Sequence, residues 1–214
     1  MGYDICLFDL DGTLTDPKIG ITKSVQYALT AFGFDVPSLD DLTKFIGPPL
    51  RDSFRCYYGL SELDTENAVA LYREYFSDKG IFENIVYQGV PEMLQYLINQ
   101  GKTIALATSK PTVYAKRILE YFGLNCYFNL VAGCELDGTR SCKSEVISYV
   151  LDMLNPQREK SVVMIGDREH DIIGANETGI DSIGVTYGYG TREELETAGA
   201  IGIVNEVSEL LKIL

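Results

Sequence analysis

The sequence predicts an α/β protein, in which a parallel β-sheet carries helices on both faces and a helical segment is inserted after the first strand. Two apolar runs, at residues 103–108 and 161–166, show no alternation of polar and apolar residues, which is typical of strands buried on both faces. Segments with helical spacing separate such runs along the second half of the chain. Between residues 16 and 82, by contrast, the spacing is helical and no strand pattern appears.

The first strand and the insertion make up the N-terminal part of the chain. Residues 5–8 form an apolar run that predicts a strand, and helical spacing follows at residues 21–32, 50–57 and 68–75. We therefore expect an all-helical domain over residues 16–85, inserted directly after the first strand.

Strands and helices alternate from about residue 86 onward. Further strands are predicted at residues 103–108, 130–132, 161–166 and 182–186. Thr191 and Glu194 have the spacing of a capping box for a short helix, and Asn205 is placed to cap the last helix. Residues 1–15 and 86–214 are thus expected to form one Rossmann-like, doubly wound catalytic core.

Composition excludes several classes of partner. The 18 Lys and Arg residues against 31 Asp and Glu give a net charge of −13, which disfavours a nucleic-acid surface. No stretch approaches the roughly 20 apolar residues of a membrane span, and the N-terminus lacks a basic region followed by an apolar one. We expect a cytoplasmic protein with no nucleic-acid or membrane partner, acting as a monomer or a weak homodimer.

The cysteines and the single histidine limit the kinds of metal and catalytic site that the chain can form. The five cysteines are odd in number and form no Cys-x-x-Cys, so we expect reduced core thiols and neither a disulfide frame nor a zinc site. His170 is the only histidine, which excludes a multi-histidine metal site and disfavours a Ser-His-Asp triad. We expect His170 at the surface or behind the ligands of the site.

Two carboxylates, Asp9 and Asp11, follow the first strand two positions apart. A strand alternates its side chains, so the two would leave a straight strand on the same side. Two adjacent acids are unfavourable unless a cation or a proton separates their charges. The carboxyl end of a strand in an open parallel sheet is also where ligands bind. Alone, such a pair is more often a solvated turn, and partners further along the chain decide between the two interpretations.

Polar residues follow the later strands as well. Thr108 and Ser109 end the second strand of the core, Asp167 ends another, and Asp171 lies one helical turn beyond it. Lys143 lies at the start of the helix between them. Each has an ordinary explanation by itself, as a cap, a solvated lysine or a first-turn acid. Because the ends of parallel strands converge on one edge of the sheet, the set predicts a single site.

These stretches resemble the four motifs of the haloacid dehalogenase-like superfamily. The matching segments are Asp-Leu-Asp-Gly-Thr at residues 9–13, Thr-Ser-Lys at 108–110, Lys143, and Gly-Asp-Arg-Glu-His-Asp at 166–171. The resemblance covers the whole chain, and the insertion resembles the α-helical cap of that superfamily. Residues 45–51, together with the overall layout, look most like the phosphoglycolate phosphatase branch, which includes related 5′-nucleotidases.

The resemblance implies a Mg²⁺-dependent phosphatase that hydrolyses small phosphorylated metabolites. Asp9 is the candidate nucleophile, because a carboxylate can attack a phosphoryl group and form an aspartyl-phosphate. Asp9, the backbone carbonyl of Asp11 and Asp167 would hold the Mg²⁺, whose preferred ligands are oxygens. Asp171 would support the waters on the metal or pair with Lys143.

Asp11 fits the general acid–base, which protonates the departing alkoxide and then deprotonates the attacking water; that role requires a raised pKa. The phosphoryl group would be bound by three further residues, Thr108, Ser109 and Lys143. Gly12 would allow close backbone approach beside the metal.

From the cap, Arg51, and with less support Lys44 and Lys23, could reach the substrate, although surface cations are the commoner explanation of such residues.

Other functions stay open at this level. A dehalogenase would not need the second acid, Asp11, and a receiver domain would be about half as long, but a phosphomutase or pyrophosphatase would share the core. A non-catalytic binding module on this fold is a further alternative. The segment Gly188-Tyr189-Gly190 lacks the third glycine of a dinucleotide fingerprint and is predicted to be a loop beside the site. Phosphoglycolate, a nucleoside monophosphate, a sugar phosphate and pyrophosphate all remain possible substrates.

Overall fold

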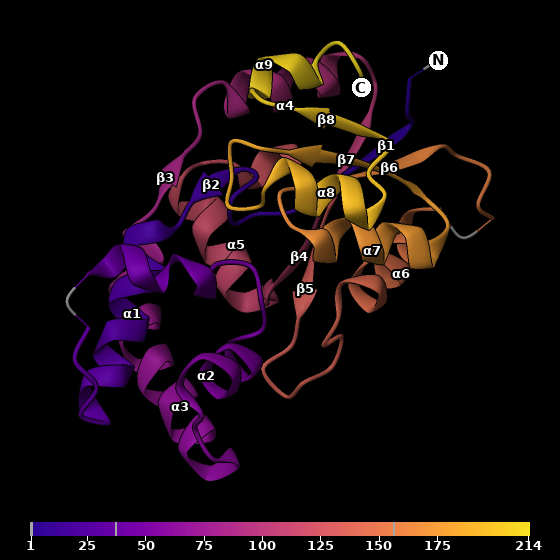
Figure 1. Ribbon diagram of the computed structural model, residues 1–214. Coiled ribbons are helices and arrows are strands. Elements are labelled where there is room, and N and C mark those ends of the chain that lie inside the picture. The colour runs from indigo at the N-terminus through magenta and orange to yellow at the C-terminus, as the bar shows by residue number, and fades with distance from the viewer. Residues whose placement is uncertain (1, 37, 156) are drawn as a thin grey trace. The chain divides into compact units, whose positions relative to one another are not determined.

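The computed structural model describes residues 2–36, 38–155 and 157–214. The chain forms two compact units, one built from residues 1–16 and 86–214 and the other from residues 17–85. Figure 1 shows the course of the chain through both. No helix among the described residues is both long and apolar enough to cross a membrane.

The unit of residues 17–85 is built from helices. Its elements are α1 (Lys18–Ala31), the 3-10 helix η1 (Leu39–Phe45), α2 (Leu50–Tyr58), α3 (Glu62–Asp78) and the 3-10 helix η2 (Gly80–Phe82). The helices pack through a small core of apolar side chains, among which Val25, Leu29, Phe54 and Ala68 are fully buried. Two short strands, β2 (Thr15–Asp16) and β3 (Ile85–Val86), pair at the points where the chain enters and leaves this unit.

The other unit is a six-stranded parallel sheet with the order β5-β4-β1-β6-β7-β8. Its strands are β1 (Ile5–Phe8), β4 (Thr103–Pro111), β5 (Leu130–Cys134), β6 (Val162–Gly166), β7 (Asp181–Val185) and β8 (Gly202–Val204). The predicted α/β class with a doubly wound parallel sheet is therefore confirmed. The order reverses direction at β1, because the chain adds β4 and β5 on one side of it and β6 to β8 on the other.

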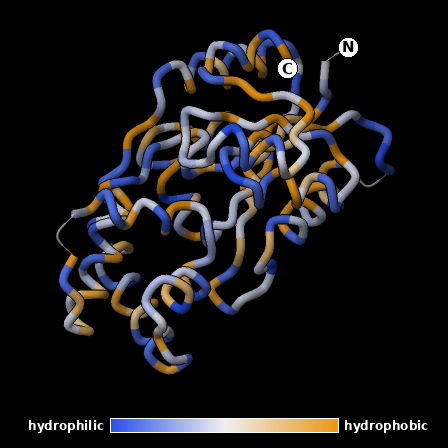
Figure 2. The backbone as a smooth tube through the Cα atoms, in the orientation of Figure 1, coloured by the Kyte–Doolittle hydropathy of each residue, from blue (hydrophilic) through white to orange (hydrophobic). Residues whose placement is uncertain are grey.

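Helices cover both faces of this sheet (Figure 1). They are α4 (Val90–Asn99), α5 (Thr112–Tyr121), α6 (Lys143–Leu154), α7 (Glu169–Thr178), α8 (Arg192–Ala198) and α9 (Val207–Leu210). The strands β1 and β6 are buried along their whole length, which explains their lack of polar alternation. Figure 2 shows these hydrophobic strands among helices of mixed hydropathy.

One short strand is absent from the predictions, and two local expectations differ from the structure. The strand β8 is only three residues long, Gly-Ile-Val, and lies at the edge of the sheet, where it pairs with β7. Thr191 does cap α8, but the carboxylate of Glu194 accepts hydrogen bonds from the Arg168 side chain and the Glu169 backbone, so the capping box is incomplete. Asn205 does not cap the last helix: its side chain accepts hydrogen bonds from Thr186 and Arg192.

The cysteines are also not all core thiols. All five are free, but only Cys6 is buried, while Cys134 is half-buried and three are exposed: Cys56, Cys126 and Cys142. The expectation of a core position was therefore wrong for most of them, because an apolar side chain of this size is tolerated on a surface.

Burial of the central strands predicts a stability test. Ile104 in β4 is fully buried, so Ile104→Ala should lower the free energy of unfolding by about 2–5 kcal/mol. Ile201 in the same unit is 61% exposed, and Ile201→Ala should change it by no more than about 0.5 kcal/mol. Urea unfolding monitored by circular dichroism measures both, and similar losses in the two variants would contradict the core assignment.

Candidate active site

The predicted acids meet where the strand order reverses. Asp9 follows β1 and Asp167 follows β6, and these two strands pair directly along the sheet. In doubly wound sheets, this is the point at which a crevice opens for a ligand. Together with Asp171, near the start of α7, they offer carboxylate oxygens that lie within 4.8 Å of one another, and all three side chains are buried.

Lys143 forms ion pairs with two of these acids. It is the first residue of α6 and is 5% exposed, and its Nζ lies 2.7 Å from Oδ1 of Asp9 and 2.7 Å from Oδ1 of Asp171. The same Nζ donates a hydrogen bond to the carbonyl of Ala107 at 2.9 Å. Burial lowers the pKa of Lys143, but the charges of Asp171 and Asp9 outweigh this effect and raise it above its ordinary value. The lysine thus stays charged although a helix N-terminus disfavours a cation.

Asp11 has a partner of its own. Its Oδ2 lies 2.7 Å from Nζ of Lys110, and both side chains are buried. Burial raises the pKa of Asp11, and the ammonium of Lys110 offsets this only in part. A raised pKa suits a carboxyl that gives and takes a proton. Lys110 is not among the predicted site residues, although it lies directly after Thr108 and Ser109; a charged residue so close to an apolar strand is the signal that could have identified it.

The phosphate-binding candidates lie at the end of β4 and beside Asp167. Thr108 is 1% exposed, and its hydroxyl accepts a hydrogen bond from the Lys110 amide at 3.3 Å. Ser109 is half-buried, and its carbonyl accepts from the thiol of Cys134 at 3.0 Å. Gly12 has a φ of 86°, and a Cβ there would lie 2.1 Å from Oδ2 of Asp167. A side chain at residue 12 would therefore displace that carboxylate.

The charges of the cluster fit a divalent cation. The cluster holds the four buried carboxylates of Asp9, Asp11, Asp167 and Asp171 and the two ammonium groups of Lys110 and Lys143. When all four carboxylates are ionised, four minus two leaves two negative charges in excess.

Two carboxylate oxygens point to the same conclusion. Oδ1 of Asp11 and Oδ1 of Asp167 are buried without a hydrogen-bond partner among the described residues. Burial, and then the charges of Asp171 and Asp9, raise the pKa of Asp167 well above its usual range. A cation beside Asp167 would relieve that penalty, and a set of carboxylate oxygens suits a hard ion such as Mg²⁺.

The other residues predicted from the sequence have different contacts in the structure. Arg51 lies in α2 of the helical unit, where its exposed side chain forms an ion pair with Glu66 at 2.7 Å. Nζ of Lys44, in η1, lies 4.6 Å from the ring centre of Tyr57. His170 is half-buried on α7. The substrate contacts of the cap residues therefore remain predictions.

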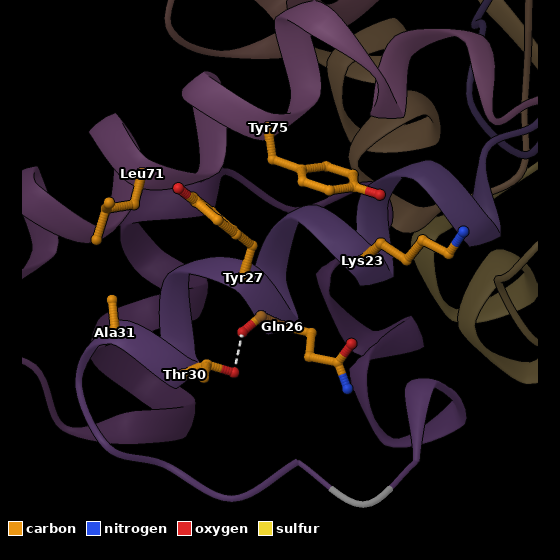
Figure 3. A pocket seen from close by; sticks show the side chains of 7 residues that line it. All are labelled: Lys23, Gln26, Tyr27, Thr30, Ala31, Leu71 and Tyr75. Atoms are coloured by element: carbon orange, nitrogen blue, oxygen red, sulfur yellow. Dashed lines mark hydrogen bonds between the residues drawn. The ribbon is translucent and has the colours of Figure 1, made fainter.

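The helical unit also has a surface hollow of about 600 Å³ between α1 and α3 (Figure 3). It is lined by Lys23, Gln26, Tyr27, Thr30, Ala31, Leu71 and Tyr75. Its polar groups already have partners: Lys23 pairs with Glu83 at 2.5 Å, and Tyr27 donates a hydrogen bond to Glu74. The hollow therefore offers no cluster of unsatisfied groups for a ligand.

Comparison with known proteins agrees with this geometry. The family model for haloacid dehalogenase-like hydrolases matches residues 6–185. A 5′-nucleotidase of Pseudomonas aeruginosa is 45% identical over 99% of this chain and 96% of its own. A phosphoglycolate phosphatase of Vibrio parahaemolyticus is 27% identical over 97% of this chain and 94% of its own.

Two further similarities extend the comparison. The tyrosine-protein kinase PtkA of Mycobacterium tuberculosis is 40% identical over 90% of this chain, which spans 65% of PtkA. The crystal structure of a predicted phosphatase from Clostridium acetobutylicum superimposes with a TM-score of 0.94, at 50% identity, over 99% of this chain and 98% of its own. The chain therefore belongs to the haloacid dehalogenase-like hydrolase family, within which it is a phosphatase.

Proposed function

We propose that this phosphatase is Mg²⁺-dependent and hydrolyses small phosphomonoesters through an aspartyl-phosphate formed on Asp9. The observation that carries the proposal is the buried cluster of Asp9, Asp167 and Asp171 at the edge of the sheet, in which the ammonium group of Lys143 pairs with Asp9 and Asp171. Such an arrangement combines a carboxylate nucleophile with the charges needed to bring a phosphate dianion beside it.

The Mg²⁺ would be held by Asp9, the backbone carbonyl of Asp11 and Asp167. When bound, it would neutralise phosphoryl oxygens and let the substrate approach the carboxylates. Lys143 holds Asp9 in one orientation and offsets its charge during the approach. Asp171 lies against the same ammonium group, so of its two predicted roles the pairing with Lys143 is the one we favour.

Asp11 moves the protons of both half-reactions. As the bond from phosphorus to the leaving oxygen breaks, Asp11 gives its proton to that oxygen and the phosphoryl group passes to Asp9. A water then attacks the phosphorus of the aspartyl-phosphate, Asp11 takes the proton of that water, and Asp9 is restored. Thr108, Ser109 and Gly12 would bind the phosphoryl oxygens from the end of β4 and the loop after β1.

A nucleoside 5′-monophosphate is the substrate class that we favour. The 45% identity to a 5′-nucleotidase exceeds the 27% identity to a phosphoglycolate phosphatase, and both comparisons span nearly the whole chain. The helical unit would act as the cap that selects the leaving group, with Arg51 as one candidate contact.

We further propose that the protein is a cytoplasmic monomer or weak homodimer without nucleic-acid or membrane partners.

A second candidate is transfer of the phosphoryl group from Asp9 to a hydroxyl other than that of water. The 40% identity to the tyrosine-protein kinase PtkA favours it, and a phosphomutase would use the same step. Phosphate release in the presence of an added acceptor alcohol or tyrosine peptide distinguishes the two. Hydrolysis predicts one inorganic phosphate for each substrate consumed, whereas transfer predicts a phosphorylated acceptor instead.

Asp9→Asn is expected to lower kcat for phosphate release by at least about a thousandfold, because it removes the nucleophile. The measurement uses nucleoside 5′-monophosphates and phosphoglycolate with Mg²⁺. Asp181→Asn, at the start of β7, is the matched control and should retain activity. Release of phosphate by Asp9→Asn at a rate close to that of the wild type would refute the nucleophile assignment, and no release by the wild-type protein from any substrate would refute the function.

Asp11→Asn should separate the two half-reactions. General acid–base catalysis contributes about 10²–10⁴ in rate, but a nitrophenolate leaving group needs little help from an acid. With p-nitrophenyl phosphate we expect a burst of about one nitrophenolate per enzyme, followed by slow turnover, because the phosphorylated Asp9 then lacks its base. With an alkyl phosphate the burst should be absent. Equal losses for both substrates without a burst would contradict the role of Asp11.

Mg²⁺ binding should stabilise the folded protein. At about a hundred times its dissociation constant, a ligand of the native state adds about 2.7 kcal/mol to the free energy of unfolding. We expect this increase in the wild-type protein and its loss in Asp167→Asn, measured by urea unfolding with Mg²⁺ and with a chelator. The same stabilisation in both proteins would exclude Asp167 as a ligand.

A further inference from the structure

The loop after β7, residues 187–190 (Tyr-Gly-Tyr-Gly), has no part in the reaction described so far. We propose that it is a positioning element for the metal ligand Asp167, anchored by the hydroxyl of Tyr189 on Asp16. The inference rests on the Mg²⁺ site of the proposed function and adds to it residues outside the four sequence motifs.

The backbone of the loop orients the carboxylate directly. The amide of Tyr189 donates a hydrogen bond to Oδ2 of Asp167 at 2.7 Å. The other oxygen, Oδ1, has no hydrogen-bond partner among the residues that the structure describes. One oxygen of Asp167 is thus fixed by the protein, while the second is left available to a ligand. Partners of this kind set the direction in which a carboxylate meets a metal.

The two glycines let the loop lie directly against Asp167. A Cβ at Gly188 would lie 2.3 Å from the carbonyl oxygen of Gly12 and 2.5 Å from Oδ2 of Asp167. A Cβ at Gly190 would lie 1.9 Å from the carbonyl oxygen of Asp167. Any side chain at either position would push the loop away, and with it the amide of Tyr189.

The two tyrosines attach the loop to the chain on both sides of the helical unit. The hydroxyl of Tyr189 donates a hydrogen bond to Oδ1 of Asp16, the last residue before that unit. The hydroxyl of Tyr187 donates to the carbonyl of Thr13 at 3.0 Å. Its ring meets the ring of Tyr87 edge-on, with the centres 5.1 Å apart, just after the chain returns from the helical unit. The loop therefore holds Asp167 through contacts that come from far along the sequence.

Tyr189→Phe isolates the anchor, because it removes the hydroxyl and keeps both the ring and the backbone amide. We expect the dissociation constant for Mg²⁺ to rise about tenfold, the lower end of the range for partners behind a metal ligand. Calorimetric titration of Mg²⁺ into metal-free protein, without substrate, measures it. The kcat at saturating Mg²⁺ should change less than about threefold, since the reacting groups are intact.

Tyr3→Phe is the matched control. The hydroxyl of Tyr3 donates to Oδ2 of Asp181 at 2.9 Å, which is the same type of bond in the same unit but at the amino end of the strands. This variant should keep the Mg²⁺ dissociation constant of the wild type.

Substitutions of Asp16 test the anchor from its other end. Asp16→Ala should weaken Mg²⁺ binding about as much as Tyr189→Phe, and the double variant should be no weaker than either. Asp16→Asn keeps an oxygen acceptor and should recover most of the affinity. If Tyr189→Phe does not fold, these Asp16 variants still test whether the bond between Tyr189 and Asp16 supports Mg²⁺ binding.

The outcomes separate the two proposals. If the wild type binds Mg²⁺ and both Tyr189→Phe and Asp16→Ala bind it equally well, the positioning role is refuted and the Mg²⁺ site stands. If the wild type releases phosphate but binds no Mg²⁺, the metal site and the positioning role both fall. If both variants lose affinity but Asp16→Asn shows no recovery, the bond between Tyr189 and Asp16 is not the anchor.

Discussion

The burial of four carboxylates at one edge of the sheet is the constraint on which the rest of the structure depends. Ionised groups removed from water are strongly destabilising unless other charges or hydrogen bonds compensate them. Lys143 compensates Asp9 and Asp171, and Lys110 compensates Asp11. When all four carboxylates are ionised, two negative charges remain in excess, which would suit a divalent cation. Under the proposed function, this excess of negative charge would attract the metal ion, and the bound metal would then attract the phosphate.

The topology brings these charges together with few residues. Because β1 and β6 pair in parallel, Asp9 and Asp167 follow adjacent strands and meet without any adjustment of the loops. The chain reaches β6 through α6, so the first residue of that helix, Lys143, arrives at the same edge. Gly12 then leaves room for Asp167 to approach the loop after β1. The sheet thus brings together the proposed nucleophile, the proposed metal ligand Asp167 and the ammonium group of Lys143 from segments far apart in sequence.

Much of this could be predicted because it is encoded locally. The apolar strands and the acids at their ends are visible in single segments, so the α/β class and the cluster of Asp9 and Asp167 follow from the pattern. The partners that depend on distant residues could not be seen in that way. The carboxylate of Glu194 accepts a hydrogen bond from the first amide of α7 instead of completing its own capping box. The hydroxyl of Tyr189 donates a hydrogen bond to Asp16, which lies 173 positions away in the chain. Short edge strands such as β8 are difficult to predict for a similar reason, because they are defined by pairing with a neighbouring strand and not by their composition.

The two acids of the first motif, Asp9 and Asp11, lie in different surroundings. Asp9 lies against an ammonium group that it shares with Asp171, so its orientation is fixed and its negative charge is balanced. Asp11 has its own lysine, yet burial still raises its pKa, which favours a carboxyl that carries a proton for part of the cycle. These different surroundings support the roles that we propose, with Asp9 as the nucleophile and Asp11 as the acid–base. Two residues of identical chemistry, two positions apart, can therefore divide phosphoryl transfer between them.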